Sequence, residues 1–242
     1  MNNITKYKKF TDYSYTLGAF TTMELLSAKA NHVRSVVVHS KYNDSDKILS
    51  LCLKQNIPVV SNDRVISRLS EKENVYVLGV FNKYKSALSE TKPHVVLVNP
   101  SSMGNLGTSM RTLAGFNICD LAIITPSADV WNPKTVRASM GSLFRINIEM
   151  FSSFEEYTGR FRHHILYPFM SDGDIILTPD FDSGTNLYSL IFGNEATGLP
   201  EIYNKAGTSI KIPQSEMIDS LNISVALGIG VYVFNMCKNK NL

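Results

Sequence analysis

Apolar residues in the first third of the chain recur in two alternating patterns. Short runs rich in β-branched residues predict buried strands, which are expected at 35–39, 57–60 and 75–81. Stretches with a helical spacing of apolar residues predict helices, which are expected at 22–30, 46–55 and 63–69. This alternation predicts a small α/β domain.

The rest of the chain alternates in the same way, with strand patterns that are apolar throughout. Strands are predicted at 94–99, 120–125, 144–150, 165–168, 174–178, 187–192 and 209–213. Helices are predicted at 105–116, 133–139, 153–161 and 220–236. Apolar strands separated by helices indicate an α/β fold with a largely parallel sheet covered on both faces. Ligands bind such sheets beyond the carboxyl ends of the strands.

A polar segment that ends at Pro93 predicts a linker at 83–93, between one domain at 1–82 and another at 94–242. Residues 1–93 carry 14 Lys and Arg against 8 Asp and Glu, a net charge of +6, and the remaining residues carry 10 against 13, a net charge of −3. A basic first domain fits a module that binds phosphates. Ordinary scatter in surface composition explains the same difference.

The composition is that of a globular protein, with 44% hydrophobic and 19% charged residues. The three cysteines form no CxxC pair and the histidines have no metal-ligand spacing, so we expect no disulfide, no metal site and a cytoplasmic setting. The apolar stretch 221–237 is about one membrane span long. It contains Asn222, Ser224 and Asn235, and no basic flank precedes it, so we interpret it as a buried helix and expect no membrane partner.

Three segments place small and polar residues directly after a predicted strand. In the first, 99–112, a glycine-containing turn leads into a helix that carries Asn105 and Arg111. Such a helix start can bind an anion, and an arginine near it can hold a phosphate through two hydrogen bonds. A capped helix with a surface arginine has the same spacing. The pattern is neither a Walker loop nor a GxGxxG fingerprint.

The second segment, 190–199, contains Glu195 between Gly193 and Gly198. Glycines on both sides of a carboxylate indicate a tight loop that approaches a ligand closely, although a plain turn has the same composition.

The third segment, 212–226, opens the apolar final helix with Ser220 and Asn222. Ser220 is a good residue for the helix N-cap. Asn222 lies in an apolar run, so it needs hydrogen-bond partners if it is buried.

Together these segments resemble the three signature motifs of the SpoU/TrmH branch of SPOUT RNA methyltransferases. The first motif, N-x-G-x-x-x-R-T, matches 105–112, and the second, G-x-E-x-x-G-L, matches 193–199. The third, I-P followed by S-L-N-V/I-S, matches 212–213 and 220–224. Each motif alone is weak, but three in order with the right gaps are specific. The first 80 residues resemble, more loosely, the L30e-like substrate-binding domain of several ribosomal RNA 2′-O-methyltransferases.

The resemblance implies transfer of a methyl group from S-adenosylmethionine to a ribose 2′-hydroxyl of RNA, with 23S ribosomal RNA as the first choice. It also implies a trefoil knot in the second domain, a homodimer, and a first domain that binds RNA. By position it assigns the cofactor to backbone groups of Gly193, Ile212 and Leu221. It assigns catalytic roles to Asn105, Arg111, Glu195, Ser220 and Asn222. Basic residues that would hold RNA are Lys6, Lys8, Lys9, Arg34, Lys41 and Arg64.

Within this resemblance Arg111 would stabilise the developing alkoxide and bind a phosphate as a cation, because a neutral guanidine is costly to form. The sequence departs from the family where Glu216 replaces a glycine of the third motif and where Val77-Leu78-Gly79 replaces a Gln-Gly pair. Two alternatives stay open, a tRNA 2′-O-methyltransferase and a non-catalytic RNA-binding paralogue. A housekeeping and an antibiotic-resistance enzyme fit the sequence equally.

Overall fold

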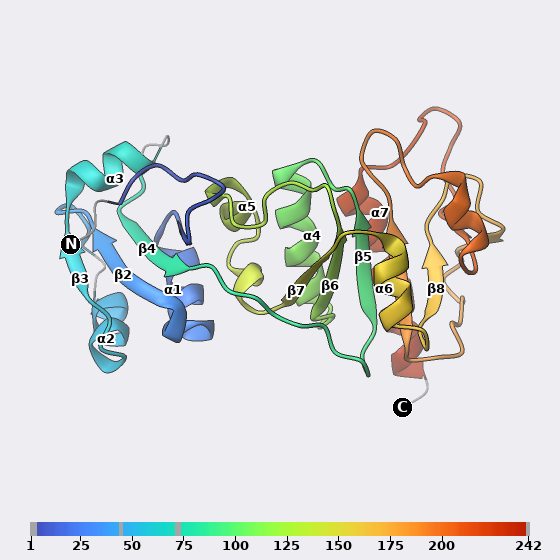
Figure 1. Ribbon diagram of the computed structural model, residues 1–242, viewed down its shortest axis with the longest axis horizontal. Helices are drawn as coiled ribbons and strands as arrows, with labels where there is room; N and C mark the ends of the chain where they lie inside the picture. The colour runs from blue at the N-terminus through green and yellow to red at the C-terminus, as the bar shows by residue number, and fades with distance from the viewer. Residues whose placement is uncertain (1–3, 44–45, 71–73, 241–242) are drawn as a thin grey trace. The chain divides into compact units, whose positions relative to one another are not determined.

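A computed structural model describes residues 4–43, 46–70 and 74–240 of the 242-residue chain. The chain forms two compact units (Figure 1). The first unit consists of Met1–Tyr84 and Asp129–Arg145, and the second of Lys85–Ala128 and Ile146–Leu242. The segment Asp129–Arg145 therefore clusters with the N-terminal residues, although sequence analysis placed it within 94–242.

The first unit is a mixed sheet with helices on it. Its strands are β1 (Tyr13–Tyr15), β2 (Val33–Val38), β3 (Val59–Ser61) and β4 (Val77–Asn82). Its helices are α1 (Ala19–Ala28), α2 (Asp46–Lys54), α3 (Asp63–Leu69) and α5 (Pro133–Ala138), with 3-10 turns η1 (Ala30–His32) and η2 (Ser142–Phe144). The strand order is β1-β4-β2-β3, with β2 parallel to β3 and the other neighbours antiparallel.

Apolar clusters cover both faces of this sheet. Val36 belongs to the cluster that contains residues of α1 and α2, whereas Val37 belongs to the cluster that contains residues of α3. Neighbouring strand residues point to opposite faces, so a purely apolar strand serves both clusters. The segment 129–145 adds Phe144, whose ring packs edge-on against Phe81 with centroids 5.2 Å apart, and Trp131, whose ring also contacts Phe81.

The second unit is built on a parallel sheet. Its strands are β5 (His94–Val98), β6 (Asp120–Ile124), β7 (Asn147–Phe151), β8 (Ile165–Pro168), β9 (Ile175–Ile176), β10 (Tyr188–Phe192) and β11 (Ile210–Lys211). Its helices are α4 (Met103–Gly115), α6 (Phe154–Arg160) and α7 (Ile223–Lys240), with a 3-10 helix η3 (Glu201–Lys205).

The main sheet has the strand order β7-β6-β5-β10-β8, and all its neighbours pair in parallel. Ser189 contacts Tyr157 of α6 at 2.6 Å, while the adjacent Tyr188 packs its ring against Phe234 of α7 with centroids 5.0 Å apart. Because successive strand residues face opposite ways, α6 and α7 cover opposite faces. Helix α4 packs beside α7. The predicted largely parallel α/β fold is confirmed.

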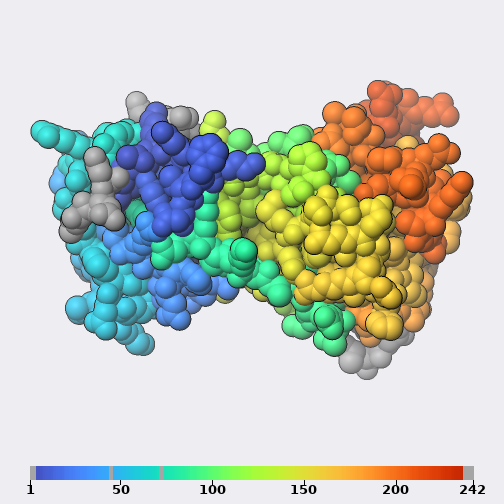
Figure 2. Space-filling view, in the orientation of Figure 1, coloured from blue at the N-terminus to red at the C-terminus, as the bar shows by residue number. Residues whose placement is uncertain are grey.

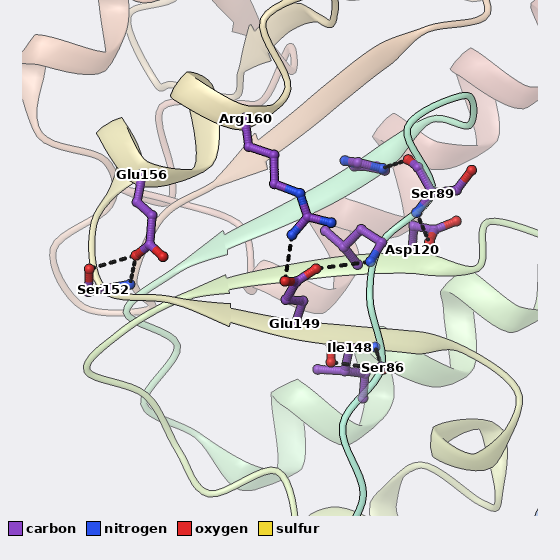
Figure 3. A network of polar contacts seen from close by, with 10 residues as sticks. Ser86, Ser89, Asp120, Ile148, Glu149, Ser152, Glu156 and Arg160 are labelled. Carbon is purple, nitrogen blue, oxygen red and sulfur yellow. Dashed lines mark hydrogen bonds and ion pairs between the residues drawn. The ribbon is translucent and has the colours of Figure 1, made fainter.

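The segment predicted as a linker is hydrogen-bonded to this sheet (Figure 3). Ser86 Oγ donates to the carbonyl of Ile148 at 2.9 Å and accepts from its N–H at 2.7 Å. The Ser89 N–H donates to Asp120 Oδ1 at 2.9 Å. Between them Leu88 is only 4% exposed and belongs to the core. The entry into β5 is therefore anchored at several points.

Some element boundaries differ from the sequence prediction for identifiable reasons. The strand predicted at 144–150 begins only at Asn147, because Ser142–Phe144 form a 3-10 turn. The final helix begins at Ile223 rather than at 220, so Ser220 is not its N-cap, an alternative that the sequence left open. Strand β1 was not predicted from the sequence. The predicted helix 63–69 and strand 165–168 are confirmed residue by residue.

In the described part of the chain, no helix has the length and hydropathy that crossing a bilayer requires. Over the same residues, His, Cys, Asp and Glu side chains form no group placed to hold a metal ion. Cys52 and Cys119 are free thiols, and the side chain of Cys237 lies outside the described part.

Candidate functional site

A cleft of about 520 Å³ opens in the second unit where β10 ends. Its walls are the loop that follows β10, the segment that follows β8, and the residues from Ile212 to the start of α7. The three residues predicted to meet a cofactor, Gly193, Ile212 and Leu221, all line this cleft. The structure therefore brings the second and third motifs together at the carboxyl end of a parallel strand, where such sheets bind ligands.

The loop after β10 folds back on itself so tightly that residue 193 must lack a side chain. A Cβ atom on Gly193 would lie 2.1 Å from the carbonyl carbon of Gly198 and 2.3 Å from the nitrogen of Leu199. The turn is closed by two backbone bonds between Asn194 and Gly198, at 3.1 and 2.9 Å, and Gly198 has a φ of +67°. The glycines thus expose backbone along the cleft wall.

Glu195 joins this loop to the segment that follows β5. Its Oε2 accepts from the N–H of Ser101 at 2.9 Å and from the Ser101 hydroxyl at 2.7 Å, and its Oε1 accepts from the N–H of Ser102 at 3.1 Å. Partial burial opposes ionisation, but the hydrogen bonds from Ser101 and Ser102 outweigh it and hold the pKa of Glu195 below its ordinary value. The carboxylate is therefore charged at neutral pH.

A chain of amide hydrogen bonds extends from this carboxylate to the third motif. Asn105 Nδ2 donates to Glu195 Oε1 at 3.3 Å, and Asn222 Nδ2 donates to Asn105 Oδ1 at 3.2 Å. Asn222 Oδ1 accepts from the N–H and the hydroxyl of Ser224, at 2.9 and 2.7 Å. Asn222 is exposed and caps α7, so the expectation that it needs partners inside an apolar run is replaced by a capping role.

The other two predicted catalytic residues lie outside this hydrogen-bond chain. Ser220 lines the cleft and is exposed. Arg111 is exposed on α4, and in the described part of the chain its guanidinium makes no hydrogen bond or ion pair. Six residues separate it from Asn105, which places it about 240° around the helix axis. Glu195 bonds Asn105, and no hydrogen bond or ion pair joins it to Arg111 in the described residues.

The charged side chains that line the cleft among the described residues are negative. Over the same part of the chain, the ionisable side chains that line it are all acidic, namely Asp172, Glu195, Glu201 and Asp219, with no Lys or Arg. Apolar side chains, among them Phe169, Phe192 and Ile210, make up much of the remaining wall. The cleft therefore suits a ligand with an apolar ring and a positive charge.

Sequence reasoning missed Ser101, Ser102 and Asn194. Ser102 caps α4 by accepting from the N–H of Asn105 at 3.3 Å, and serine before a helix is a readable signal for such a cap. Asn194 Nδ2 donates to the carbonyl of Asn99 at 2.6 Å, which ties the loop to the end of β5. No sequence signal marks Asn194, because its partner lies 95 positions away.

Residues 92–232 match the model of the SpoU rRNA Methylase family. The 23S rRNA (adenosine(1067)-2′-O)-methyltransferase of Streptomyces azureus is 27% identical over 197 residues, which cover 77% of this chain and 72% of that enzyme. The match to this relative is longer than the family region alone.

Two solved structures have related folds. The AdoMet-bound rRNA methyltransferase of Sinorhizobium meliloti aligns with a TM-score of 0.78 at 24% identity, covering 96% of this chain and 88% of that one. A protein whose structure concerns the 2-OH methylation of C/U34 on tRNA aligns with a TM-score of 0.57 at 25% identity, covering 63% of this chain and 99% of its own.

Proposed function

Since the chain belongs to the SpoU rRNA methylase family, we propose that it transfers a methyl group from S-adenosylmethionine to a ribose 2′-hydroxyl of ribosomal RNA. The observation that carries this proposal is the meeting of three distant sequence segments, of which the second and third line one cleft and the first is hydrogen-bonded to both. Glu195 and Asn105 bond each other across 90 positions, and Asn105 and Asn222 across 117.

The apolar and acidic lining of the cleft suits S-adenosylmethionine. This cofactor supplies a methyl group activated by a positively charged sulfur. The bare backbone at Gly193 allows close approach, and the apolar side chains of Phe192 and Ile212 line the cleft beside it. The acidic lining favours the cationic cofactor over a neutral or anionic ligand. Gly193, Ile212 and Leu221 would hold the cofactor chiefly through their backbone groups.

The polar residues beside the cleft would position the ribose. Asn105 and Asn222 are oriented through each other and through the charged Glu195, so their geometry is fixed before RNA binds. Ser220 lines the cleft close to Asn222 in sequence and would contact the ribose or its phosphate. Glu195 acts through Asn105 and through the two serines after β5, and it is therefore a positioning residue.

Arg111 would meet the RNA as an unneutralised cation. It is exposed and has no carboxylate partner in the described residues, so its charge is available to a phosphate or to the developing ribose alkoxide. Since the methyl group is already activated, the protein has to align the 2′-oxygen, help remove its proton and stabilise the charge that develops on it.

The share of this chain that each relative covers favours ribosomal RNA over tRNA as the substrate. The relative from Streptomyces azureus, which is named for 23S rRNA, matches 77% of the chain. The tRNA-related structure is matched over almost all of its own length but over only 63% of this chain. The rest of this chain has no counterpart there, and the basic residues 1–93 would suit a larger RNA. A tRNA 2′-O-methyltransferase is the second candidate, supported by the same 25% identity over the shared part.

A homodimer belongs to the same proposal. Helix α7 exposes Val225 at 49%, Tyr232 at 52% and Met236 at 41%. Spacings of seven and four place these residues on one face of a helix, so a second copy would remove an apolar stripe from water. A cytoplasmic location follows from the proposed substrate.

Methyl transfer from labelled cofactor to separate pools of ribosomal RNA and tRNA tests the proposal, with 2′-O-methyl positions mapped by resistance to alkali. Label at one ribose of ribosomal RNA supports it, and label in tRNA alone replaces it with the second candidate. Cofactor binding without label in isolated RNA or intact ribosomes would identify a non-catalytic RNA-binding paralogue and overturn it.

Arg111→Ala tests the role of the cation. We expect methyl transfer to fall by about 100-fold or more, as when one stabilising donor is removed from an active site. Cofactor affinity measured by calorimetry should stay unchanged, since Arg111 does not line the cleft. The matched control is Arg162→Ala, because Arg162 is also exposed in the second unit and bonds only the carbonyl of Gly159 among the described residues. Near-normal turnover by the Arg111 variant would contradict the role.

A further inference from the structure

A second cavity, of about 560 Å³, lies entirely within the first unit. It is lined by the N-terminal residues Lys6 and Tyr7, by parts of β1 and α3, and by 132–140 around α5. The N-terminal segment lies at the surface of this unit (Figure 2, dark blue). The volume falls within the range of roughly 300–1,000 Å³ that small-ligand sites occupy.

Every described charged residue that lines this cavity is basic. The three are Lys6, Lys134 and Arg137, and in the described part of the chain none of their charged groups makes a hydrogen bond or an ion pair. Arg137 is partly buried, so its unpaired guanidinium has lost part of its hydration without gaining a partner.

Two other arginines of the same unit have carboxylate partners, whereas Arg137 has none among the described residues. Arg34 pairs with Asp12 at 2.5 Å, and Arg145 pairs with Glu24 at 2.5 Å. Arg34 was one of the residues predicted from sequence to hold RNA, and its carboxylate partner counts against that role. Lys134 and Arg137 were not predicted, because they lie outside the basic N-terminal stretch in sequence.

The uncharged lining is suited to a planar heterocycle. Tyr7 and Tyr15 present aromatic surface, and Met140, 40% exposed, adds a flexible apolar side chain. Tyr7 is held in place because its hydroxyl donates to Asp129 Oδ2 at 2.6 Å. Asn132 Oδ1 accepts from the N–H of Lys134 at 3.0 Å, which leaves the Asn132 amide nitrogen as a donor for the edge of a base.

We propose that this cavity binds one unpaired nucleotide of the RNA substrate, with the base against the aromatic and apolar lining and the phosphate on Lys134 and Arg137. Proteins recognise RNA sequence mainly through unstacked bases that lie on aromatic or guanidinium surfaces, while phosphates meet Lys and Arg. A cavity of this size admits an extruded base and excludes a duplex. The inference rests on the proposed function only in taking RNA as the substrate.

The first test measures binding of a short, labelled, single-stranded RNA of mixed sequence to the full chain, without cofactor, over a series of salt concentrations. The double variant Lys134→Gln/Arg137→Gln removes two charges from the cavity. The matched control, Lys47→Gln/Lys54→Gln, removes two charges from exposed positions of α2 in the same unit. We expect the cavity variant to bind at least roughly ten-fold more weakly, and its salt slope to fall by about 0.7, the value for one phosphate contact on a single strand. The control should match the unmodified chain.

The second test uses the unmodified chain and depends on no variant's folding. Methionine methyl signals are recorded by NMR while the four nucleoside 5′-monophosphates are added in turn, and the Met140 signal is assigned through Met140→Leu. We expect the Met140 signal to move and the signals of Met150 and Met217 to stay, since these are exposed at 47% and 91% and lie outside the cavity.

Equal RNA binding by the cavity and control variants, or a Met140 signal that no nucleotide moves, would overturn the inference. Neither test reads methyl transfer. A chain that binds RNA through this cavity but never methylates it would refute the proposed function alone, and a methyltransferase that binds RNA equally well without the two charges would refute this inference alone.

Discussion

His94 and His164 lie side by side inside the second unit. Their ring centroids are 4.2 Å apart, and the residues are 0% and 7% exposed. His94 Nε2 lies 2.7 Å from the carbonyl oxygen of Ser89, which can only accept, so this nitrogen carries the proton. His94 Nδ1 then accepts from the hydroxyl of Tyr157 at 2.8 Å when the ring is neutral. Protonation of that nitrogen would break the arrangement.

Burial lowers the pKa of both rings. It lowers the pKa of His164 from 6.5 to about 4, with repulsion from His94 as the next cause, and it lowers the pKa of His94 in the same direction. A folded-state pKa below the unfolded value means that this stability is complete above pH 6.5 and is lost as the pH falls toward 4. At 1.36 kcal/mol per pH unit, His164 alone contributes about 3 kcal/mol, of which about 2 kcal/mol is lost near pH 5.

His164→Asn removes the titrating group and keeps an amide near the position of Nδ1, which contacts Ser189 at 2.9 Å. We expect the unmodified chain to lose roughly 4–8 °C of melting temperature between about pH 7.5 and about pH 5 through His164, and the variant to lose that much less. Calorimetry on the full chain measures both. His163→Asn is the matched control, since His163 is exposed and adjacent in sequence. An identical pH dependence in the His164 variant and the unmodified chain would refute the reasoning.

Three further predictions concern the site and the assembly. Gly193→Ala should abolish cofactor binding in calorimetry, because its Cβ would lie 2.1 Å from backbone, whereas Gly115→Ala, which meets nothing within 4 Å, should bind normally. Asn222→Ala should lower the free energy of unfolding by about 1 kcal/mol through the lost cap, and methyl transfer by about ten-fold through the lost bond to Asn105; unchanged turnover would exclude a positioning role. Tyr232→Lys should turn a dimer into a monomer in sedimentation, and an unaltered dimer would show that this face of α7 is not the interface.

The cleft could be predicted from sequence because its construction depends on residue types with narrow roles. Glycine at 193 is required by a contact that no side chain allows, and a strand followed by such a loop marks a binding edge. The grouping of Gly193, Ile212 and Leu221 at one cleft is therefore visible from the motifs. The position of each motif at a strand end follows from the apolar strand patterns alone.

The partners of the polar residues could not be predicted, because they depend on long-range packing. Glu195 bonds Ser101 and Ser102 rather than Arg111, and nothing in the spacing of these residues distinguishes the two arrangements. The placement of 129–145 in the first unit has the same origin. It depends on contacts between aromatic rings about 50 positions or more apart in sequence, such as Phe81 with Trp131. Such contacts produce no periodic pattern of apolar residues in the sequence.

The division of the chain into units limits where the chain can be truncated and how its N-terminal part can be gained or lost in evolution. The backbone passes from one unit to the other three times, after Tyr84, after Ala128 and after Arg145. A chain beginning at residue 85 would keep Trp131 and Phe144 but lose the ring of Phe81 that covers them. The N-terminal part is thus no detachable appendage. Any relative without a counterpart of it must shield those rings by other means, so gain or loss of this part in evolution demands matched changes on both sides of the cut.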